Sequence, residues 1–355
     1  MNTSIRPGQV YLDENGKRIE AHGGYIFIDG DTFYWYGENK EKTLGKDKMW
    51  TYGIRYYSSK DFYNWKDEGF LIEPSDDKKN VMFYERRIDR PHVIKNKKGE
   101  YICWIKYNDS SSFAIFKADE FKGPYTLVNE KYQAYGKKCG DFDFNYDEEG
   151  NIYLFVEVDH VDLISAKLND EGTECVGDPV YHYKGIKPPF TREGVTCFKR
   201  NGKYYLLTSG MSGYVPNPSE AAVADEVQGP YRILGDPHVD EKGVSSYNSQ
   251  LSCIFKYPGK DLYVSIADRW VPEFEVDAEV HDKLTRAIAS NFNKKYKATL
   301  KEKIWMMRSP LMGKANTSIS NYVILPLEFE GDMPVIHWRD EWSLDSFSTE
   351  PIESK

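Results

Sequence analysis

Five polar residues with chemically useful side chains recur along the chain at a nearly constant interval. They are His22, Asp89, Asp141, Glu193 and Gln250, with steps of 67, 52, 52 and 57 positions. Carboxylates gathered around one pocket raise each other's pKa, which is what a general acid needs at neutral pH. If the five side chains meet, one protonated carboxyl and one group that activates water could hydrolyse a glycosidic bond.

Metal binding is the alternative use of such a cluster. The five residues lack the dense spacing of metal ligands, so no cofactor is expected to be required, and a structural calcium ion stays compatible with the carboxylates. The chain also has 5 cysteines without a Cys-x-x-Cys spacing, which argues against a disulfide framework or a zinc site.

A tyrosine-rich strand pattern repeats in phase with the polar residues. A turn containing glycine precedes a strand in each copy, and each polar residue lies 12 or 13 positions before the matching tyrosine. The matching residues are Tyr34, Tyr101, Tyr153, Tyr205 and Tyr263. A second repeat, from 118 to 125, recurs from 224 to 231, an offset of 106 or two units. Fixed-period similarity of this kind indicates a repeat architecture.

Each unit has room for four short antiparallel strands, the composition of a propeller blade. Five units predict an all-β fold, a five-bladed β-propeller whose ring closure removes exposed sheet edges. We expect residues 1–355 to form a single catalytic domain. The segments 322–327 and 334–338 are expected to complete the ring near the N-terminal blade.

A segment of about 271–316, after the tyrosine strand of the fifth unit, breaks the pattern. Val280, Leu284, Ala287 and Ile288 recur there at helical spacing, which predicts a partly helical insertion. Three interpretations remain open for it: a lid, an oligomer contact and a solvated excursion.

Composition excludes several partner classes. The 355 residues contain 47 Lys+Arg and 56 Asp+Glu, a formal net charge of −9, so nucleic acid is not an expected partner. No run approaches the roughly 18 consecutive apolar residues of a membrane span, so no membrane partner is expected either. Without a visible signal sequence the expected location is cytoplasmic, or secreted if a signal has been removed.

With these motifs the sequence resembles glycoside hydrolase family 43, and within it the branch of exo-β-1,3-galactanases. The resemblance covers nearly the whole chain outside the insertion. The segments that carry it include Ala21-His-Gly-Gly24, Tyr34-Trp-Tyr-Gly-Glu38, Arg90-Pro-His-Val93, Arg192-Glu193, Phe198-Lys-Arg-Asn-Gly-Lys-Tyr-Tyr205 and Ala267-Asp-Arg-Trp270.

The resemblance implies catalytic roles position by position. Glu193 matches the general acid, and Asp141 matches the carboxylate that orients this acid and raises its pKa. Most of the family has an Asp base in the first blade, where this chain has His22. The galactanase branch shares this loss and uses a fifth-blade glutamine, which matches Gln250, to direct the water.

Further polar and aromatic residues are candidates for substrate binding. Asp89 stands where the galactanase branch has a glutamate that contacts substrate. Arg90 and Arg269 are expected to hold the acidic cluster together by paired hydrogen bonds. The complete set of substrate-binding candidates is His22, Glu38, Asp89, Tyr214, Asp268 and Trp270.

The sequence therefore favours an inverting, exo-acting glycoside hydrolase that releases galactose from β-1,3-linked galactan or galacto-oligosaccharides. Its expected partner is an oligosaccharide or polysaccharide substrate, with an oligomer formed through the insertion as an open interpretation. Within the same family the alternative is an α-L-arabinofuranosidase or β-xylosidase. In other classes the alternatives are a catalytically silent carbohydrate-binding propeller and a protein-interaction propeller.

Overall fold

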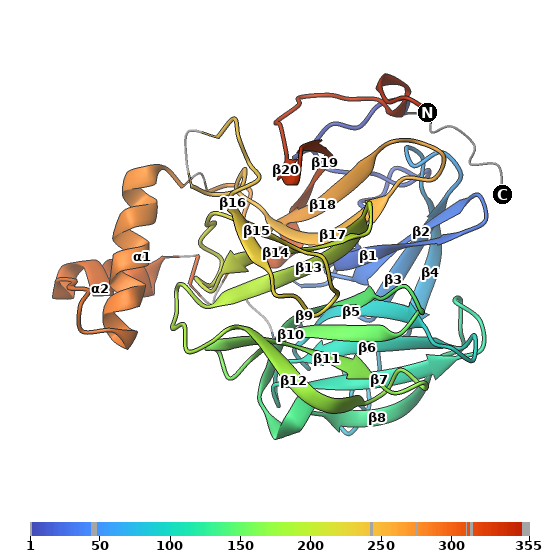
Figure 1. The fold of residues 1–355 in the computed structure, drawn as a ribbon, viewed down its shortest axis with the longest axis horizontal. Coiled ribbons are helices and arrows are strands. Elements are labelled where there is room, and N and C mark those ends of the chain that lie inside the picture. The colour runs from blue at the N-terminus through green and yellow to red at the C-terminus, as the bar shows by residue number, and fades with distance from the viewer. Residues whose placement is uncertain are drawn as a thin grey trace.

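Five four-stranded antiparallel sheets make up the fold, and they are arranged as the blades of a propeller (Figure 1). The computed structural model describes residues 2–43, 48–241, 244–274, 276–309, 311–312 and 315–349. Every sheet takes four strands that are consecutive in the chain. The prediction of an all-β, five-bladed propeller is therefore confirmed.

The first three blades come from the first half of the chain. The first has β1 (His22–Asp29), β2 (Thr32–Glu38), β3 (Ile54–Ser59) and β4 (Lys66–Ile72). The second has β5 (Ile88–Lys95), β6 (Tyr101–Tyr107), β7 (Ser112–Ala118) and β8 (Thr126–Tyr132). The third has β9 (Cys139–Tyr146), β10 (Ile152–Val158), β11 (Asp162–Leu168) and β12 (Cys175–Tyr183).

The last two blades complete the ring. The fourth has β13 (Arg192–Arg200), β14 (Lys203–Gly210), β15 (Glu220–Ala224) and β16 (Arg232–Gly235). The fifth has β17 (Gln250–Lys256), β18 (Tyr263–Arg269), β19 (Asn321–Glu330) and β20 (Met333–Val335). Short 3₁₀ turns lie at Ala134–Gly136, Thr317–Ile319 and Leu344–Ser346. The C-terminal strands are thus the third and fourth strands of the fifth blade.

Tight turns set the register of the strands that carry the polar residues. Between β13 and β14 the two-residue turn is Asn201-Gly202, with φ of 50° and 73°. An Asn-Gly pair with both residues left-handed is the turn that matches the twist of a hairpin. This turn places Phe198 opposite Tyr205 and brings Glu193 opposite Ser209 at the far end of the hairpin.

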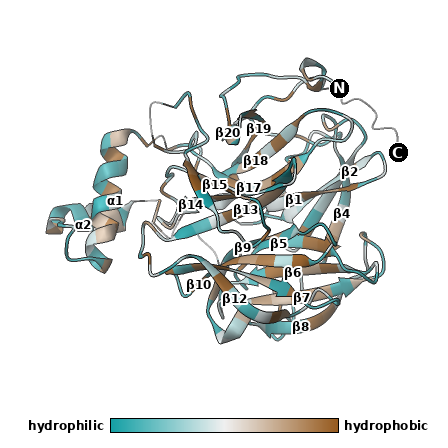
Figure 2. Cartoon of the chain, viewed as in Figure 1, coloured by the Kyte–Doolittle hydropathy of each residue, from teal (hydrophilic) through white to brown (hydrophobic). Residues whose placement is uncertain are grey.

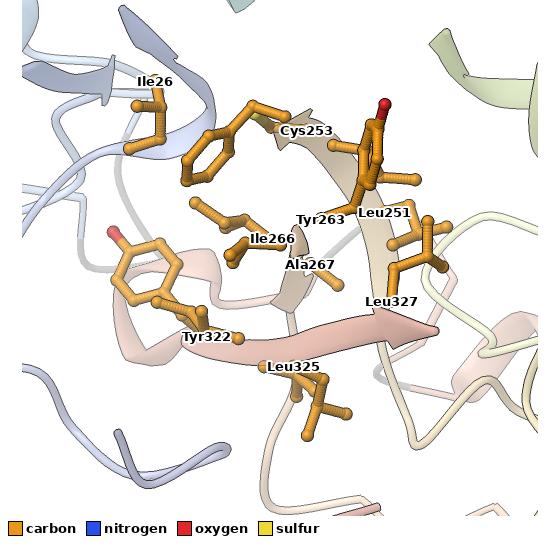
Figure 3. Close-up of a cluster of buried hydrophobic side chains, with 14 of the residues drawn as sticks. Ile26, Leu251, Cys253, Tyr263, Ile266, Ala267, Tyr322, Leu325 and Leu327 are labelled. Carbon is orange, nitrogen blue, oxygen red and sulfur yellow. The ribbon is translucent and has the colours of Figure 1, made fainter. Parts of the chain in front are cut away.

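Apolar clusters lie between neighbouring blades. Figure 3 shows part of the largest, in which Ile26 of the first blade approaches Ile266 and Tyr322 of the fifth. The ring of Tyr322 also packs edge-on against Trp35, with centroids 4.6 Å apart. Figure 2 shows the apolar residues concentrated along the strands. Burial of these rings on both sides of each sheet holds adjacent blades together.

The predicted insertion contains two helices, α1 (Ala278–Phe292) and α2 (Leu300–Arg308), between β18 and β19. Both project from one side of the propeller (Figure 1). Asp277 caps α1 by accepting a hydrogen bond from the Val280 amide, and Thr299 with Glu302 forms a capping box on α2. Neither helix, nor any other in the described residues, is long and apolar enough to cross a membrane.

The insertion is anchored to the propeller by its own apolar cluster. Leu284 of α1, which is fully buried, belongs to one cluster with Val215 and Val271, and Tyr214 and Trp270 pack against it. These contacts come from loops that follow β14 and β18. The position of α1 is therefore coupled to two of the predicted substrate-binding residues.

We expect Leu284→Ala to destabilise the insertion by about 2–5 kcal/mol, because it leaves a cavity in a packed cluster. Hydrogen exchange of the α1 amides would measure this loss. Leu300→Ala is the matched control, since Leu300 is 75% exposed and its removal should leave exchange unchanged. Equal protection of α1 in both variants would show that the cluster does not hold the helix.

Candidate active site

The innermost strand of every blade has an irregular register next to its predicted polar residue. The shifts lie between His22 and Tyr25 in β1, Asp89 and His92 in β5, Glu193 and Thr196 in β13, and Leu251 and Cys253 in β17. In the third blade the shift lies between Val156 and Val158 of β10, opposite the segment that contains Asp141. A bulge bends the strand and redirects its side chains. The same kind of local distortion therefore lies next to each of the five polar residues.

In three blades the residue after the polar position is left-handed, and its amide donates to a carboxylate of the preceding blade. Glycine is the residue that adopts this conformation most readily, and it occurs in two of the three cases. The three pairs are Gly23 with Asp268 at 2.9 Å, Arg90 with Glu38 at 2.9 Å and Gly194 with Asp141 at 3.0 Å. Each link fixes the innermost strand of one blade to the preceding blade, through its innermost strand at Asp141 and through its second strand at Glu38 and Asp268.

Asp141 on β9 is surrounded by donors. Arg90 Nε lies 3.1 Å from Oδ2, and Lys106 Nζ donates to Oδ1 at 2.7 Å. Burial alone would raise the pKa of Asp141, but the positive charges of Arg90 and Lys106 hold that pKa well below its ordinary value. Asp141 is therefore a fixed negative charge at neutral pH.

Glu193 on β13 has the opposite environment. Its side chain is half-buried, and no described residue donates a hydrogen bond to its carboxyl group or forms an ion pair with it. Burial, followed by the negative charge of Asp141, raises the pKa of Glu193 to about 8. Glu193 is thus a carboxyl that keeps its proton at neutral pH, which is the property of a general acid.

Gln250 at the start of β17 is oriented by three hydrogen bonds. Its Oε1 accepts from Arg90 Nη2 at 2.9 Å and from Trp270 Nε1 at 3.3 Å, while its Nε2 donates to Ser209 Oγ at 2.9 Å. The two donors occupy both lone pairs of Oε1. The second N–H of Nε2 is the polar group that remains for a ligand.

Glu193 and Gln250 are close neighbours across the fourth and fifth blades. Ser209, which pairs with Glu193 in the strand register, is the residue that accepts from Gln250. A Cβ placed on Gly194 would lie 2.9 Å from Gln250 Nε2, which shows how closely the backbone approaches the amide. The structure therefore brings together the three predicted catalytic residues.

A small cavity of about 30 Å³ lies beside Gln250. Ser209, Tyr214, Asp268 and Trp270 are among the residues that line it. This volume is sufficient for one water molecule with polar partners. The cavity therefore offers a place where Gln250 could hold a water.

Two of the predicted substrate-binding residues, His22 and Glu38, lie outside the lining of this cavity, while Asp268 belongs to it. His22 is fully buried, with its ring nitrogens 3.1 Å from Asp268 and from Glu20. Glu38 is 1% exposed and pairs with Lys40 at 2.7 Å, and Asp268 is 1% exposed. The polar atoms of these three side chains bind other protein groups, and direct contact with a sugar stays a prediction for them.

Those buried contacts also set the charge state of two of these groups, His22 and Glu38. Burial lowers the pKa of His22, but its hydrogen bonds with Asp268 and Glu20 outweigh this and the pKa is raised. Burial raises the pKa of Glu38 to about 7, against the opposing charge of Lys40. Through these contacts both groups hold the side chains around them in fixed positions.

The other predicted residues lie at or near the opening. Tyr214 and Trp270 are half-buried and meet edge-on with centroids 6.2 Å apart. Asp89 is half-buried and accepts hydrogen bonds from Trp50 Nε1 and Asn108 Nδ2. Arg269 donates to the Tyr247 carbonyl and lies over the Trp338 ring, and its expected place in the acidic cluster stays a prediction.

A second polar series was missed in the sequence. Lys106, which binds Asp141, and Glu157, whose charge raises the pKa of Glu193, lie at the ends of second strands. The signal was present, since a polar residue follows each repeated tyrosine by four or five positions. The series is Glu38, Lys106, Glu157, Ser209 and Asp268.

The acidic residues do not form a donor set for a metal ion. Among the described residues no group of three or more His, Cys, Asp or Glu side chains is placed to hold one. Oxygen atoms of Asp141, Glu38 and Asp268 are engaged by N–H groups or cations instead. A structural calcium ion stays a prediction from the sequence.

The geometry as a whole combines a protonated carboxyl, a permanently charged neighbour and an oriented amide beside a water-sized cavity. Such an arrangement can protonate a leaving oxygen and hold a water molecule. The chain belongs to the glycosyl hydrolases of family 43, whose family model matches residues 22–252. No curated protein sequence matches the chain.

Solved structures of the same family are similar over nearly the whole chain. A β-1,3-galactosidase of family 43 is 26% identical with a TM-score of 0.78, covering 98% of this chain and 65% of that one. A second, with galactodeoxynojirimycin, is 23% identical with a TM-score of 0.76, covering 96% and 100%. The exo-β-1,3-galactanase from Phanerochaete chrysosporium with β-1,3-galactotriose is 23% identical with a TM-score of 0.76, covering 98% and 70%. The chain thus spans less than two thirds of the first of these proteins.

The raised pKa of Glu193 predicts a pH-dependent effect of Glu193→Gln on stability. Between the ordinary carboxyl pKa of 4.5 and about 8 the folded state keeps a proton that the unfolded state loses, so stability from this group falls as pH rises through that range. The variant should therefore gain melting temperature relative to the wild type at pH 9 but not at pH 4. Glu226→Gln, at an exposed position, is the control, and an equal difference at both pH values for Glu193→Gln would contradict the assignment.

Proposed function

We propose that the protein is an inverting, exo-acting glycosidase that releases galactose from the non-reducing end of β-1,3-linked galactan. The observation that carries the reaction is the protonated Glu193 next to the charged Asp141 and the oriented Gln250. The sugar and linkage rest on similarity, since the 26% identical structure is described as a β-1,3-galactosidase.

In this mechanism Glu193 donates its proton to the glycosidic oxygen as the bond to the anomeric carbon breaks. A water held by the free N–H of Gln250 attacks the opposite face of the oxocarbenium-like carbon, which inverts its configuration. The excess proton leaves to solvent and Glu193 is reprotonated. Gln250 positions the water and does not remove its proton, because Arg90 and Trp270 already donate to its Oε1.

The product profile on a linear β-1,3-galactan tests substrate and mode of action together. We expect galactose as the sole early product, and proton NMR at early times should show the α-anomer. A ladder of oligosaccharides would contradict exo action, and initial β-galactose would contradict inversion. Aryl β-galactoside, arabinofuranoside and xyloside assayed in parallel separate the proposed sugar from the alternatives within the family.

The loss of activity on removing the general acid should depend on the leaving group of the substrate. Glu193→Gln should lower kcat/KM on a β-1,3-galacto-oligosaccharide by about 10²–10⁴-fold. The loss should be much smaller for an aryl galactoside whose phenol leaves without protonation. An equal loss on both substrates would assign Glu193 a structural role, and sugar binding by calorimetry without turnover in the wild type would favour the catalytically silent propeller.

The alkaline limb of kcat/KM should report Glu193. Activity is expected to fall as pH rises through about 8, because only the protonated carboxyl is active. Asp141→Asn should move this limb to lower pH, since it removes the negative charge that favours the proton. Lys106→Met should move it to higher pH, because Lys106 lowers the pKa of Glu193. Shifts in the same direction for both variants would contradict the electrostatic assignment.

Gln250→Ala tests the water-positioning role. A lost orientation of the attacking water should lower kcat by about 10²-fold with little change in KM. Gln228→Ala is the matched control, since Gln228 donates to Ser165 in the third blade, and it should leave kcat unchanged. A fully active Gln250→Ala enzyme would leave the water to another group.

We also propose that no cofactor is required. The rate should be the same before and after treatment with EDTA and dialysis, because the groups assigned to the reaction are all side chains of this chain. Loss of activity on chelation with recovery on adding Ca²⁺ would contradict this.

A further inference from the structure

A second cavity, of about 540 Å³, lies between the insertion and the loop that leads into β13. Aromatic rings from both sides contribute to its lining. Phe190 is 41% exposed and Phe292 is 47% exposed, and the rings of Phe190 and Tyr296 are 5.5 Å apart. Exposed aromatic faces gathered in a concave site are suited to packing against the apolar faces of sugar rings.

The charge of this cavity is opposite to that of the protein. Lys187 from the loop and Lys294 from the insertion line it, and none of the described residues that line it is acidic. Neither lysine forms an ion pair with a described residue. The surrounding segment 293–303 has five lysines and one glutamate, Glu302, which is engaged by Arg286 at 2.9 Å. A chain of net charge −9 thus presents a local positive potential here.

The loop that lines the cavity runs directly into β13, the strand that carries Glu193. Phe190 precedes Glu193 by three residues, which places their backbones within about 11 Å at full extension. The Thr191 carbonyl accepts from the Met211 amide at 2.9 Å, and the Tyr214 amide donates to the Leu311 carbonyl of the insertion at 2.9 Å. The loop after β14, the loop into β13 and the insertion are therefore joined by backbone hydrogen bonds.

We propose that this cavity binds an anionic sugar unit, carried as a branch on the substrate whose terminal bond lies at Glu193. The inference rests on the proposed function. Lys187 and Lys294 supply the two charges that recognise a carboxylate or sulfate group, and Phe190 and Tyr296 supply faces for the ring. Lysine binds an anion as a point charge without a fixed geometry, so both uronosyl and sulfated sugars fit this chemistry.

An anionic sugar is favoured over a neutral one because Lys187 and Lys294 form no ion pair with a described residue. Two lysines that line one cavity, with no acidic residue among its described lining, repel each other, and an anion between them relieves the repulsion. A neutral sugar would gain from the rings alone. The insertion would then act as a specificity element for charged branches, which adds to the lid and oligomer interpretations.

The test compares two matched substrates and two matched double variants. The substrates are a β-1,3-galacto-oligosaccharide with a glucuronosyl branch and the same compound after reduction of the carboxyl group. Lys187→Ala/Lys294→Ala removes the charges in the cavity. Lys297→Ala/Lys301→Ala removes the same net charge from exposed positions outside it.

In the wild type kcat/KM should be about tenfold higher for the acidic substrate, a size that two solvent-accessible charge pairs can supply. The cavity variant should lose this preference while its rate on the reduced substrate is unchanged. The control variant should keep it, and added salt should weaken it. No preference in the wild type, or equal loss in both variants, would overturn the proposal.

Binding to the Glu193→Gln variant separates this inference from the proposed function. Calorimetry with a glucuronosyl-galactose disaccharide and with a sulfated galactose disaccharide measures the cavity without turnover. Binding that disappears in the Lys187→Ala/Lys294→Ala background supports the anion site even if no galactan is cleaved. Cleavage of neutral galactan without any anion-dependent binding would support the proposed function and reject this site.

Discussion

The interaction on which the site depends is the hydrogen bond between a left-handed backbone amide of one blade and a carboxylate of the preceding blade. It occurs at Gly23, Arg90 and Gly194. Each of them directly follows one of the five polar residues that recur in phase with the tyrosines. At Gly194 the φ of +59° favours glycine, and any Cβ at this position would lie only 2.6 Å from Ser209 Oγ. Because Asp141 holds the Gly194 amide, the group that tunes the acid also fixes the backbone that carries it.

This dual use of carboxylates explains how two acids in one site reach opposite protonation states. Asp141 receives an amide, a guanidinium and an ammonium group, so its charged form is stabilised. Glu193 receives none of these from the described residues and feels the charge of Asp141. Environments that drive two pKa values apart define the acid and its fixed neighbour. Arg90 extends the arrangement across the ring, since it bonds both Asp141 and Gln250.

The fold and the centre of the site were accessible from the sequence because both obey the repeat. A tyrosine strand and a polar residue in constant phase predicted five blades and the meeting of Glu193, Asp141 and Gln250. Lys106 could have been found by the same reasoning, because it belongs to a series of polar residues that follow the repeated tyrosines by four or five positions. The burial of Glu38 and Asp268 could not, because it depends on which amide of a neighbouring blade each carboxylate reaches, and the burial of His22 depends on its contacts with Asp268 and Glu20.

The residues proposed for the reaction lie in the repeated segments of the chain, and the aromatic residues proposed for substrate binding lie in non-repeated ones. The groups assigned to proton transfer and water positioning lie on inner strands, where blade-to-blade bonds leave little freedom. Tyr214 and Trp270 lie on loops whose positions depend on the apolar contacts of α1. Helical spacing in the sequence revealed α1, but it could not show that the buried face of the helix supports the rim. A change in the insertion can therefore alter what reaches Glu193 without disturbing the bonds that set its pKa, as expected when function is built on loops around a rigid scaffold.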